Sequence, residues 1–346
     1  MAIEVRDYRP RSDAAAVSDL WNRVLGGPAG GQTVEWLFRP GPAGENPRVV
    51  AEDGGRIVAH AGAMALRFLV DGEEVRGGYS VAAMTDPAWR GQRLFFRVGE
   101  QLYRRMEEEG FALVAGFSNR NSVRLMTGPL RRTPLRPFPW CAKVLRPLAL
   151  AGALLGRRTA MRGAPRPPRA SEAGVEVVAC LPDDSRLDAV WVRAAERKAV
   201  SVVRDTAFAA WRYGTRPDAG YRLLVAQRSG EPVGWSAWRF LVLRGIPTGF
   251  LVDLVVAGDE EGAGAALLAA VEAEARRAGA ALMSALLPGG GPAREALRRS
   301  GYWRVPERMH PQVICFSVRA LGRFAARPSL VDPRAWRLAW ADTDVV

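Results

Sequence analysis

The chain has 346 residues, of which 48% are hydrophobic and 25% charged, the proportions of an ordinary globular protein. This length allows two domains, each with a core of its own. The formal net charge of +13 is carried mainly by arginine. Because no run of five basic residues and no known nucleic-acid-binding module occurs, no nucleic-acid partner is expected.

Cysteine and histidine are too sparse to form a metal centre. The three cysteines are far apart in the sequence, and only two histidines could add ligands, so neither a metal site nor a disulfide framework is expected. No apolar run approaches the roughly 18 residues of a membrane span, and the first residues lack an apolar signal region. A cytoplasmic protein without membrane contact is therefore expected.

The first part of the chain predicts one α/β unit. Apolar runs and turn residues indicate an edge strand, a helix capped near Ser12 and Asp13, a hairpin around Asp53–Gly55, and two further strands. A second helix starts at Leu94 and repeats apolar residues every four positions. In chain order the predicted elements span residues 3–8, 12–25, 49–51, 57–59, 63–70, 79–85, 94–106 and 112–117.

The loop between the strand at 79–85 and the next helix is the strongest functional signal. Asp86-Pro87 ends the strand, and a short basic loop over 88–93 leads into the helix. A helix N-terminus offers backbone N–H groups and the positive end of a dipole to an anion, usually a phosphate.

Residues 87–95, Pro-Ala-Trp-Arg-Gly-Gln-Arg-Leu-Phe, resemble the acyl-CoA pyrophosphate loop of the GNAT acyltransferase superfamily. Arg90 stands at the Arg/Gln position of that pattern, Arg/Gln-x-x-Gly-x-Gly/Ala, with Gly91 next to it, whereas Arg93 replaces its middle glycine and Phe95 its last small residue. Arg93 either closes the backbone cradle or adds a guanidinium to the phosphates.

The resemblance implies a cofactor site for acetyl-CoA or another acyl-CoA. Backbone N–H groups near Met84 and Thr85 would polarise the thioester, and an Asn-rich turn would meet the CoA arm. The implied cofactor residues are Met84, Thr85, Arg90, Gly91, Gln92, Arg93, Leu94, Phe95, Asn119 and Ser122. No metal is implied.

The usual acid and base of this family are not evident. In this family a tyrosine commonly protonates the leaving thiolate. Its position is occupied by Met126 in the first half and by Leu297 in the second. Tyr79 stands where a general-base glutamate is common, although a tyrosine of pKa about 10 is a poor base. Asp253, inside an apolar strand, is either a base of raised pKa or a buried partner of an arginine. His60 and Cys141 are expected to be core residues.

The second half repeats the first with a constant offset. Trp36 and Trp211 are 175 residues apart, as are Ala51 and Ala226, and the hairpin at 53–59 matches 228–234. This register predicts a tandem duplication, with a strand at 250–256, a helix at 261–278, a strand at 281–287 and a helix at 293–300. Three carboxylates in the second loop, 257–263, would repel a pyrophosphate, so the first copy is assigned the cofactor.

The predicted organisation has four parts. Residues 1–144 form an N-terminal GNAT-like domain and 175–320 a C-terminal one. An Arg/Pro-rich linker, 145–174, joins them; its apolar stretch docks on the first domain or, alternatively, forms a membrane-surface helix. In the tail, 321–346, the two tryptophans are expected to pack on a domain face, with ligand stacking as the alternative.

The expected fold is therefore α/β (α+β), with two tandem GNAT-like domains, each a mixed, mostly antiparallel sheet flanked by helices. The implied activity is acyl transfer from acyl-CoA to the primary amine of a small molecule, such as an amino sugar, an aminoglycoside-like compound or a cell-surface precursor. The alternative is a non-catalytic relative that binds CoA or a partner. The sequence allows a homodimer.

Overall fold

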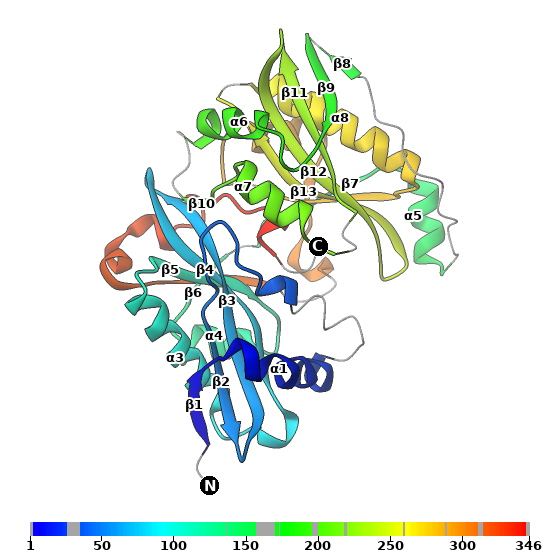
Figure 1. The fold of residues 1–346 in the computed structure, drawn as a ribbon. Coiled ribbons are helices and arrows are strands. Elements are labelled where there is room, and N and C mark those ends of the chain that lie inside the picture. Colours follow the sequence, from blue (N-terminus) through cyan, green and yellow to red (C-terminus); the bar gives the residue numbers. More distant parts are fainter. Residues whose placement is uncertain are drawn as a thin grey trace. The chain divides into compact units, whose positions relative to one another are not determined.

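A computed structural model describes residues 3–25, 35–136, 138–156, 170–172, 174–195, 200–217, 220–258, 260–287, 289–310 and 314–343. The chain divides into two compact units, each collecting two separate stretches of sequence. Unit 1 comprises Met1–Phe138 with Gln312–Asp332, and unit 2 comprises Pro139–Pro311 with Pro333–Val346. Each unit contains a mixed, mostly antiparallel sheet with helices packed on it (Figure 1), which confirms the expected fold class.

In unit 1 the sheet contains one parallel pair of neighbouring strands, β4 with β5, and its other neighbours run antiparallel. Helix α1 (Pro10–Leu25) packs on β3 and β4, α3 (Leu94–Glu108) packs on β2 and β3, and α4 (Val123–Thr127) is short. The strand order is β1 (Glu4–Asp7), β2 (Arg48–Asp53), β3 (Arg56–Val70), β4 (Glu73–Thr85), β5 (Leu113–Ser118), β16 (Cys315–Ala320) and β6 (Thr133–Leu135).

The core of unit 1 follows the predicted periodicity. Leu94, Val98, Leu102 and Met106 of α3 are each at most 1% exposed, so the four-residue spacing marks the buried face of the helix. The strands expected at 57–59 and 63–70 are one continuous strand, β3. The two expected strands are not separated by a turn. Gly62, which lies between them, continues the strand and pairs with Val81 of β4.

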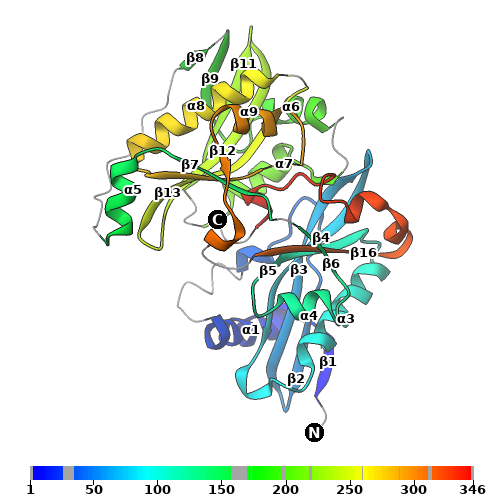
Figure 2. The ribbon, with the colours of Figure 1, turned by 180° about the vertical axis from the view of Figure 1, so that it is seen from behind.

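In unit 2 the strand order is β15 (Trp303–Arg304), β7 (Trp140–Val144), β14 (Leu282–Leu286), β13 (Ile246–Val256), β12 (Glu231–Leu243), β11 (Arg222–Arg228), β9 (Val175–Cys180) and β8 (Ala170–Glu172). Its helices are α5 (Pro147–Leu154), α6 (Arg186–Ala195), α7 (Thr206–Ala209), α8 (Glu261–Ala278) and α9 (Pro292–Arg299), and a short strand, β10, spans Val200–Val202. Helices α8 and α9 pack side by side and share one core with the sheet (Figure 2).

The internal repeat is visible in the irregularities of the two sheets. The register of β2 against β3 shifts between Ala51 and Glu52, and that of β11 against β12 shifts between Ala226 and Gln227. These two bulges are 175 residues apart, the offset seen in the sequence. Each unit also pairs one long strand in parallel with the strand that follows its main helix, β4 with β5 and β13 with β14. The duplication is confirmed.

The domain boundaries differ from the expected ones because two strands belong to the other unit. Trp140–Val144, placed at the end of the first domain, forms β7 beside β14 in unit 2. Cys315–Ala320, placed at the end of the second domain, forms β16 between β5 and β6 in unit 1. Thus β16, the neighbour of β5 in unit 1, comes from the second half of the sequence. Likewise β7, the neighbour of β14 in unit 2, comes from the first half.

The expected linker and tail behave differently from one another. In the linker, Leu148, Leu154 and Leu155 are 90%, 68% and 76% exposed, so the expectation that this apolar stretch docks on a domain is wrong for these leucines. The Arg/Pro-rich segment after it, 157–169, lies outside the described residues. In the tail, Trp336 and Trp340 are buried in unit 2, as expected.

None of the helices in the described part of the chain is long and apolar enough to cross a membrane.

Candidate acyl-CoA site

The loop after β4 is anchored at its start by Asp86. One carboxylate oxygen, Oδ1, accepts the N–H of Ala88 at 3.2 Å, and Oδ2 accepts Arg23 Nε at 3.0 Å and Arg56 Nη2 at 2.9 Å. Burial by itself would raise the pKa of Asp86, but the Ala88 N–H and the two guanidinium groups outweigh it and hold the pKa below its usual value. The strand-to-loop transition is therefore fixed by a charged carboxylate.

The middle of the loop is fixed by Trp89. Its Nε1 donates to Asp53 Oδ2 at 2.8 Å, and the Arg56 guanidinium lies over the indole, 4.7 Å from the ring centroid. Asp53 and Arg56 belong to the tight turn between β2 and β3, so that turn supports the loop.

The last part of the loop presents its backbone to the solvent. Gly91 has φ +84°, and Arg93, at the N-cap of α3, has φ +58° and ψ +17°. The first backbone bond within the helix runs from Arg97 N–H to Arg93 O at 3.0 Å, so the N–H groups of residues 94–96 precede the intrahelical ladder. An α-helix N-terminus with such N–H groups suits an anion.

Arg93 departs from the family pattern without altering the backbone that the pattern implies. Its left-handed conformation is the one that glycine adopts most easily. The guanidinium lies 5.3 Å from the centroid of the Phe96 ring, and Arg90, Gln92 and Arg93 are all exposed. This geometry agrees with a charged group at the loop surface rather than with a closed cradle.

Two of the expected cofactor residues have side chains directed to the core. Leu94 and Met84 are each 1% exposed, and Phe95 packs partly against the same core as Leu94. Leu94 and Phe95 can therefore contribute only backbone N–H groups to an anion.

Strands β4 and β5 separate beside this loop. They pair only from Gly77 with Leu113 to Tyr79 with Ala115, whereas β4 continues to Thr85 and β5 to Ser118. Six residues of β4, 80–85, thus extend beyond the parallel ladder. Figure 1 shows the neighbouring strands of this sheet.

The backbone direction in this part of β4 follows from its pairing with β3. Asp86 N–H donates to Val58 O at 2.9 Å. Because N–H groups alternate along a strand, Met84 N–H is directed at β3, and Thr85 N–H points away from β3, to the β5 side. Of the two groups expected to polarise a thioester, only that of Thr85 has the required direction. Thr85 Oγ1 is buried and has no hydrogen-bond partner among the described atoms.

The Asn-rich turn after β5 is largely self-satisfied. Asn119 Oδ1 accepts the N–H groups of Asn121 at 3.0 Å and Ser122 at 3.1 Å, and Ser122 Oγ lies 3.2 Å from the same oxygen. Asn119 is exposed and Ser122 half-buried. The side-chain carbonyl of Asn119 and the Ser122 hydroxyl thus shape the turn.

Tyr79 lies in an aromatic cluster of unit 1. It is 2% exposed, and its ring centroid lies 5.4 Å from Phe68, 6.0 Å from Phe117 and 6.3 Å from Phe316. Such surroundings are typical of a core tyrosine. At the position of the usual acid, Met126 is 6% exposed and its sulfur lies 3.8 Å from Tyr103 Oη.

Asp253 lies in unit 2 and holds a network of buried charges. Its Oδ2 accepts Arg204 Nε and, at 3.1 Å, the Tyr213 hydroxyl, and its Oδ1 accepts Arg337 Nη2 at 2.9 Å. A second carboxylate, Asp342, also accepts from Arg204. Of the two roles that the sequence left open, these contacts favour the buried ion pair. Tyr79 and Asp253 belong to different units.

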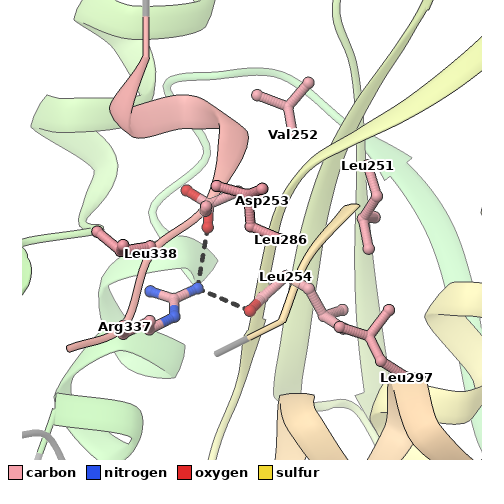
Figure 3. A pocket seen from close by; sticks show the side chains of 9 residues that line it. Leu251, Val252, Asp253, Leu254, Leu286, Leu297, Arg337 and Leu338 are labelled. Carbon is pink, nitrogen blue, oxygen red and sulfur yellow. Dashed lines mark hydrogen bonds and ion pairs between the residues drawn. The ribbon is translucent and has the colours of Figure 1, made fainter. Parts of the chain in front are cut away.

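In unit 2 the equivalent strand opening is filled by the chain itself. Strands β13 and β14 pair only from Thr248 to Phe250, and beyond that point the tail passes them (Figure 3). Arg337 Nη2 donates to the Leu254 carbonyl at 2.7 Å. The small cavity left there is lined mainly by Leu251, Leu286, Leu297, Leu338 and Ala339.

The loop that precedes α8 carries no free anion site in its described part. Glu260 is paired with Arg228 at 3.1 Å and with Arg193 at 3.8 Å, which is the ordinary stabilising role of an acid at a helix start. Asp259 lies outside the described residues. The contacts of Asp86 and Arg337 were not predicted from the sequence. An Asp-Pro pair at a strand end is a recognisable cap signal, but nothing in the sequence marks Arg337.

Comparisons with known proteins agree with this geometry. Residues 4–123 match the family model described as an acetyltransferase (GNAT) domain. No curated protein matches the sequence. The family-model match includes the Arg90–Phe95 loop and agrees with the resemblance to the GNAT superfamily over these residues.

Solved structures share the fold over nearly the whole chain. A conserved Enterococcus faecalis protein of unknown function, described as a probable N-acyltransferase, has TM-score 0.61 at 9% identity, covering 93% of this chain and 73% of the other. A GCN5-related N-acetyltransferase from Anabaena variabilis has TM-score 0.62 at 9% identity, with the same coverages. Saccharomyces cerevisiae N-myristoyltransferase with bound myristoyl-CoA has TM-score 0.60 at 12% identity, covering 92% and 83%. At these identities the likeness concerns the fold.

Proposed function

We propose that the protein is an acyl-CoA-dependent N-acyltransferase that uses unit 1 to bind acetyl-CoA or a related thioester. The observation that carries the proposal is the continuity of two features on one strand. β4 separates from β5 after Tyr79, and the same strand ends in the anchored loop whose backbone opens at Gly91 and Arg93. In acyl-CoA the thioester arm and the pyrophosphate are parts of one molecule. In this chain the strand opening, suited to the arm, and the loop, suited to the pyrophosphate, are joined by residues 80–93.

The described residues fit such a cofactor. The loop supplies N–H groups of the first turn of α3 and the exposed cations Arg90 and Arg93 for a pyrophosphate. The strand opening supplies the Thr85 N–H and its unpartnered hydroxyl for a polar group of the acyl arm. When bound, acyl-CoA supplies an activated acyl carbon for attack by an amine.

The chain's own residues would act mainly by position and polarisation. A backbone N–H aimed at the developing oxyanion stabilises the transition state of acyl transfer, and in this chain the Thr85 N–H has the suitable direction. The contacts of Tyr79 and Asp253 favour structural roles. We therefore propose that the ammonium proton of the acceptor leaves through water and that the thiolate is protonated from solvent, with a small-molecule primary amine as acceptor.

The first test is isothermal titration of the full chain with acetyl-CoA. Micromolar binding that is weakened at least tenfold in Arg90→Ala is expected. Arg104→Ala is the matched control, because Arg104 is another exposed arginine, on α3 away from the loop. A screen of amines that follows thiol release then identifies the acceptor. Undetectable binding of acetyl-CoA by the wild type would contradict the proposal.

A non-catalytic role as a CoA-binding protein is the second candidate. It is favoured by one observation, the buried Met126 at the position where related enzymes place their acid. Tight binding of acetyl-CoA without thiol release for any amine class, including amino sugars and aminoglycosides, would support this role over catalysis.

A further inference from the structure

His60, on β3 beside the strand opening, is completely buried and hydrogen-bonded on both ring nitrogens. Nδ1 lies 2.8 Å from the Ala82 carbonyl oxygen, and Arg48 Nε donates to Nε2 at 3.2 Å. An arginine N–H can only donate. Nε2 must therefore accept, so the ring is the neutral tautomer with its proton on Nδ1, and that proton is donated to Ala82 O.

Arg48 is itself held in place from both sides. Its guanidinium carbon lies 3.4 Å from the centroid of the Tyr8 ring and 3.9 Å from that of Phe38. The Phe38 ring also contacts His60 edge-on at 5.3 Å. The chain of contacts from Arg48 through His60 to Ala82 thus has little freedom to reorient.

Ala82 is the residue where β4 changes its register. Val81 pairs with Gly62 and Met84 with His60, so Ala82 and Ala83 together oppose the single residue Ala61. Ala82 has φ +52°, a conformation that costs an L-residue free energy and persists only where its surroundings enforce it. The His60 hydrogen bond is a contact that enforces it.

The extra residue of this bulge sets the direction of the backbone downstream. Without it, the alternation of the strand would point Thr85 N–H at β3 instead of toward the opening. With it, Thr85 directs its N–H group to the β5 side.

We propose that Arg48 and His60 are positioning residues that lock the β4 bulge and thereby aim the Thr85 N–H group at the carbonyl of the bound acyl group. The inference rests on the proposed function and extends it to residues that do not touch the ligand. The hydrogen bonds from Arg48 to His60 and from His60 to Ala82 should therefore strengthen the binding of acyl-CoA, which has that carbonyl. They should not affect the binding of free CoA, which lacks it.

The test is the ratio of the dissociation constants of free CoA and acetyl-CoA, measured by titration calorimetry. A hydrogen bond contributes about 1 kcal/mol, or roughly fivefold. We expect His60→Leu, which cannot donate to Ala82, to lower this ratio about fivefold by weakening acetyl-CoA only. In His60→Asn the side-chain amide N–H takes the place of Nδ1–H, and the wild-type ratio should be restored.

Two further variants make the test decisive. Val50→Ala is the matched control, because Val50 is buried on β2 opposite His60 and its truncation loosens the same region without touching Ala82; its ratio should equal that of the wild type. Arg48→Met keeps a side chain between the two rings but removes the donor, and it should lower the ratio even if His60→Leu fails to fold.

Equal losses of affinity for both ligands in His60→Leu, or an unchanged ratio in a folded Arg48→Met, would overturn the inference while leaving acyl-CoA binding intact. A wild type that binds neither ligand would instead refute the proposed function. The two failures are thus distinguishable.

Discussion

Arg337 donates one hydrogen bond to the Leu254 carbonyl, at 2.7 Å, beyond the point where β13 and β14 stop pairing. The tail of the chain thereby fills the opening of the second sheet that corresponds to the proposed acyl-arm site of the first. Arg337 also binds Asp253 at 2.9 Å, so the residue considered as a base in the sequence is the residue that holds the tail. The duplication has kept the architecture in both units, and in unit 2 the opening is used for packing.

The first prediction concerns Asp253→Asn. The change removes one of two carboxylates that balance the buried guanidinium groups of Arg204 and Arg337. Breaking a buried ion pair on one side typically costs about 3–5 kcal/mol, so the free energy of unfolding of the folded chain should fall by that amount in urea denaturation.

Asp183→Asn is the control for this measurement, because Asp183 is an exposed aspartate of the same unit; a change within about 0.5 kcal/mol is expected. If Asp253 were a general base, Asp253→Asn would instead leave the stability unchanged and abolish turnover.

The second prediction concerns Arg93→Gly. Glycine adopts the φ +58° conformation of this position without the steric cost paid by arginine, so the folded loop itself keeps its shape. Because the exposed guanidinium is lost, affinity for acetyl-CoA should fall about tenfold, the size expected for a hydrogen bond to a charged group. Calorimetry at low and high salt measures it, and tighter binding by the variant would show that Arg93 obstructs the cradle.

The third prediction concerns Gly91→Ala. A Cβ at this position would meet no atom within 4 Å, but φ is +84°, so the cost is conformational and not steric. We expect a loss of about 1 kcal/mol in stability together with weaker acetyl-CoA binding, because the backbone must shift to relieve the strain. Gly55→Ala provides the comparison, with φ +83° and equally open space in the β2–β3 turn. It should lose similar stability with a smaller loss of binding.

The loop and the repeat could be predicted because both are visible as patterns of residue types in the sequence itself. The spacing of Leu94, Val98, Leu102 and Met106 and the Asp86-Pro87 stop are properties of adjacent residues. The partners of the two exchanged strands could not be predicted in this way. Trp140–Val144 pairs with residues about 144 positions away in the chain, and a short apolar strand carries no information about which sheet edge it will join.

In the candidate site, too, some residues could be predicted from local patterns and others depend on contacts between distant parts of the chain. Arg90 and Gly91 were identified from a motif, whereas the direction of the Thr85 N–H depends on the bulge at Ala82, and that bulge depends on His60 and Arg48 from two other strands. Polar residues such as His60 were expected only to be core residues, because a single sequence does not show which carbonyl a buried imidazole will face.

The final prediction concerns pH and His60. Burial, assisted by the positive charge of Arg48 and opposed by the bond to Ala82, lowers the pKa of His60 from 6.5 to about 3. The unfolded chain therefore binds a proton between pH 6.5 and 3 that the folded chain does not. Stability from this residue is fully present above pH 6.5 and is lost as the pH falls through this window. At pH 5 the loss amounts to about 2 kcal/mol relative to pH 7.5, at 1.36 kcal/mol per pH unit.

His60→Asn cannot take up this proton, so its stability should fall about 2 kcal/mol less than that of the wild type between pH 7.5 and 5, as measured by urea denaturation at both values. The buried carboxylates of unit 1, Asp13 and Asp86, have pKa values below 3.8 in the folded chain, so their contributions are lost mainly at lower pH and are common to both proteins. Parallel pH dependences of wild type and variant would show that the folded chain protonates His60 in the same pH range as the unfolded chain, which would contradict a lowered pKa for the buried ring.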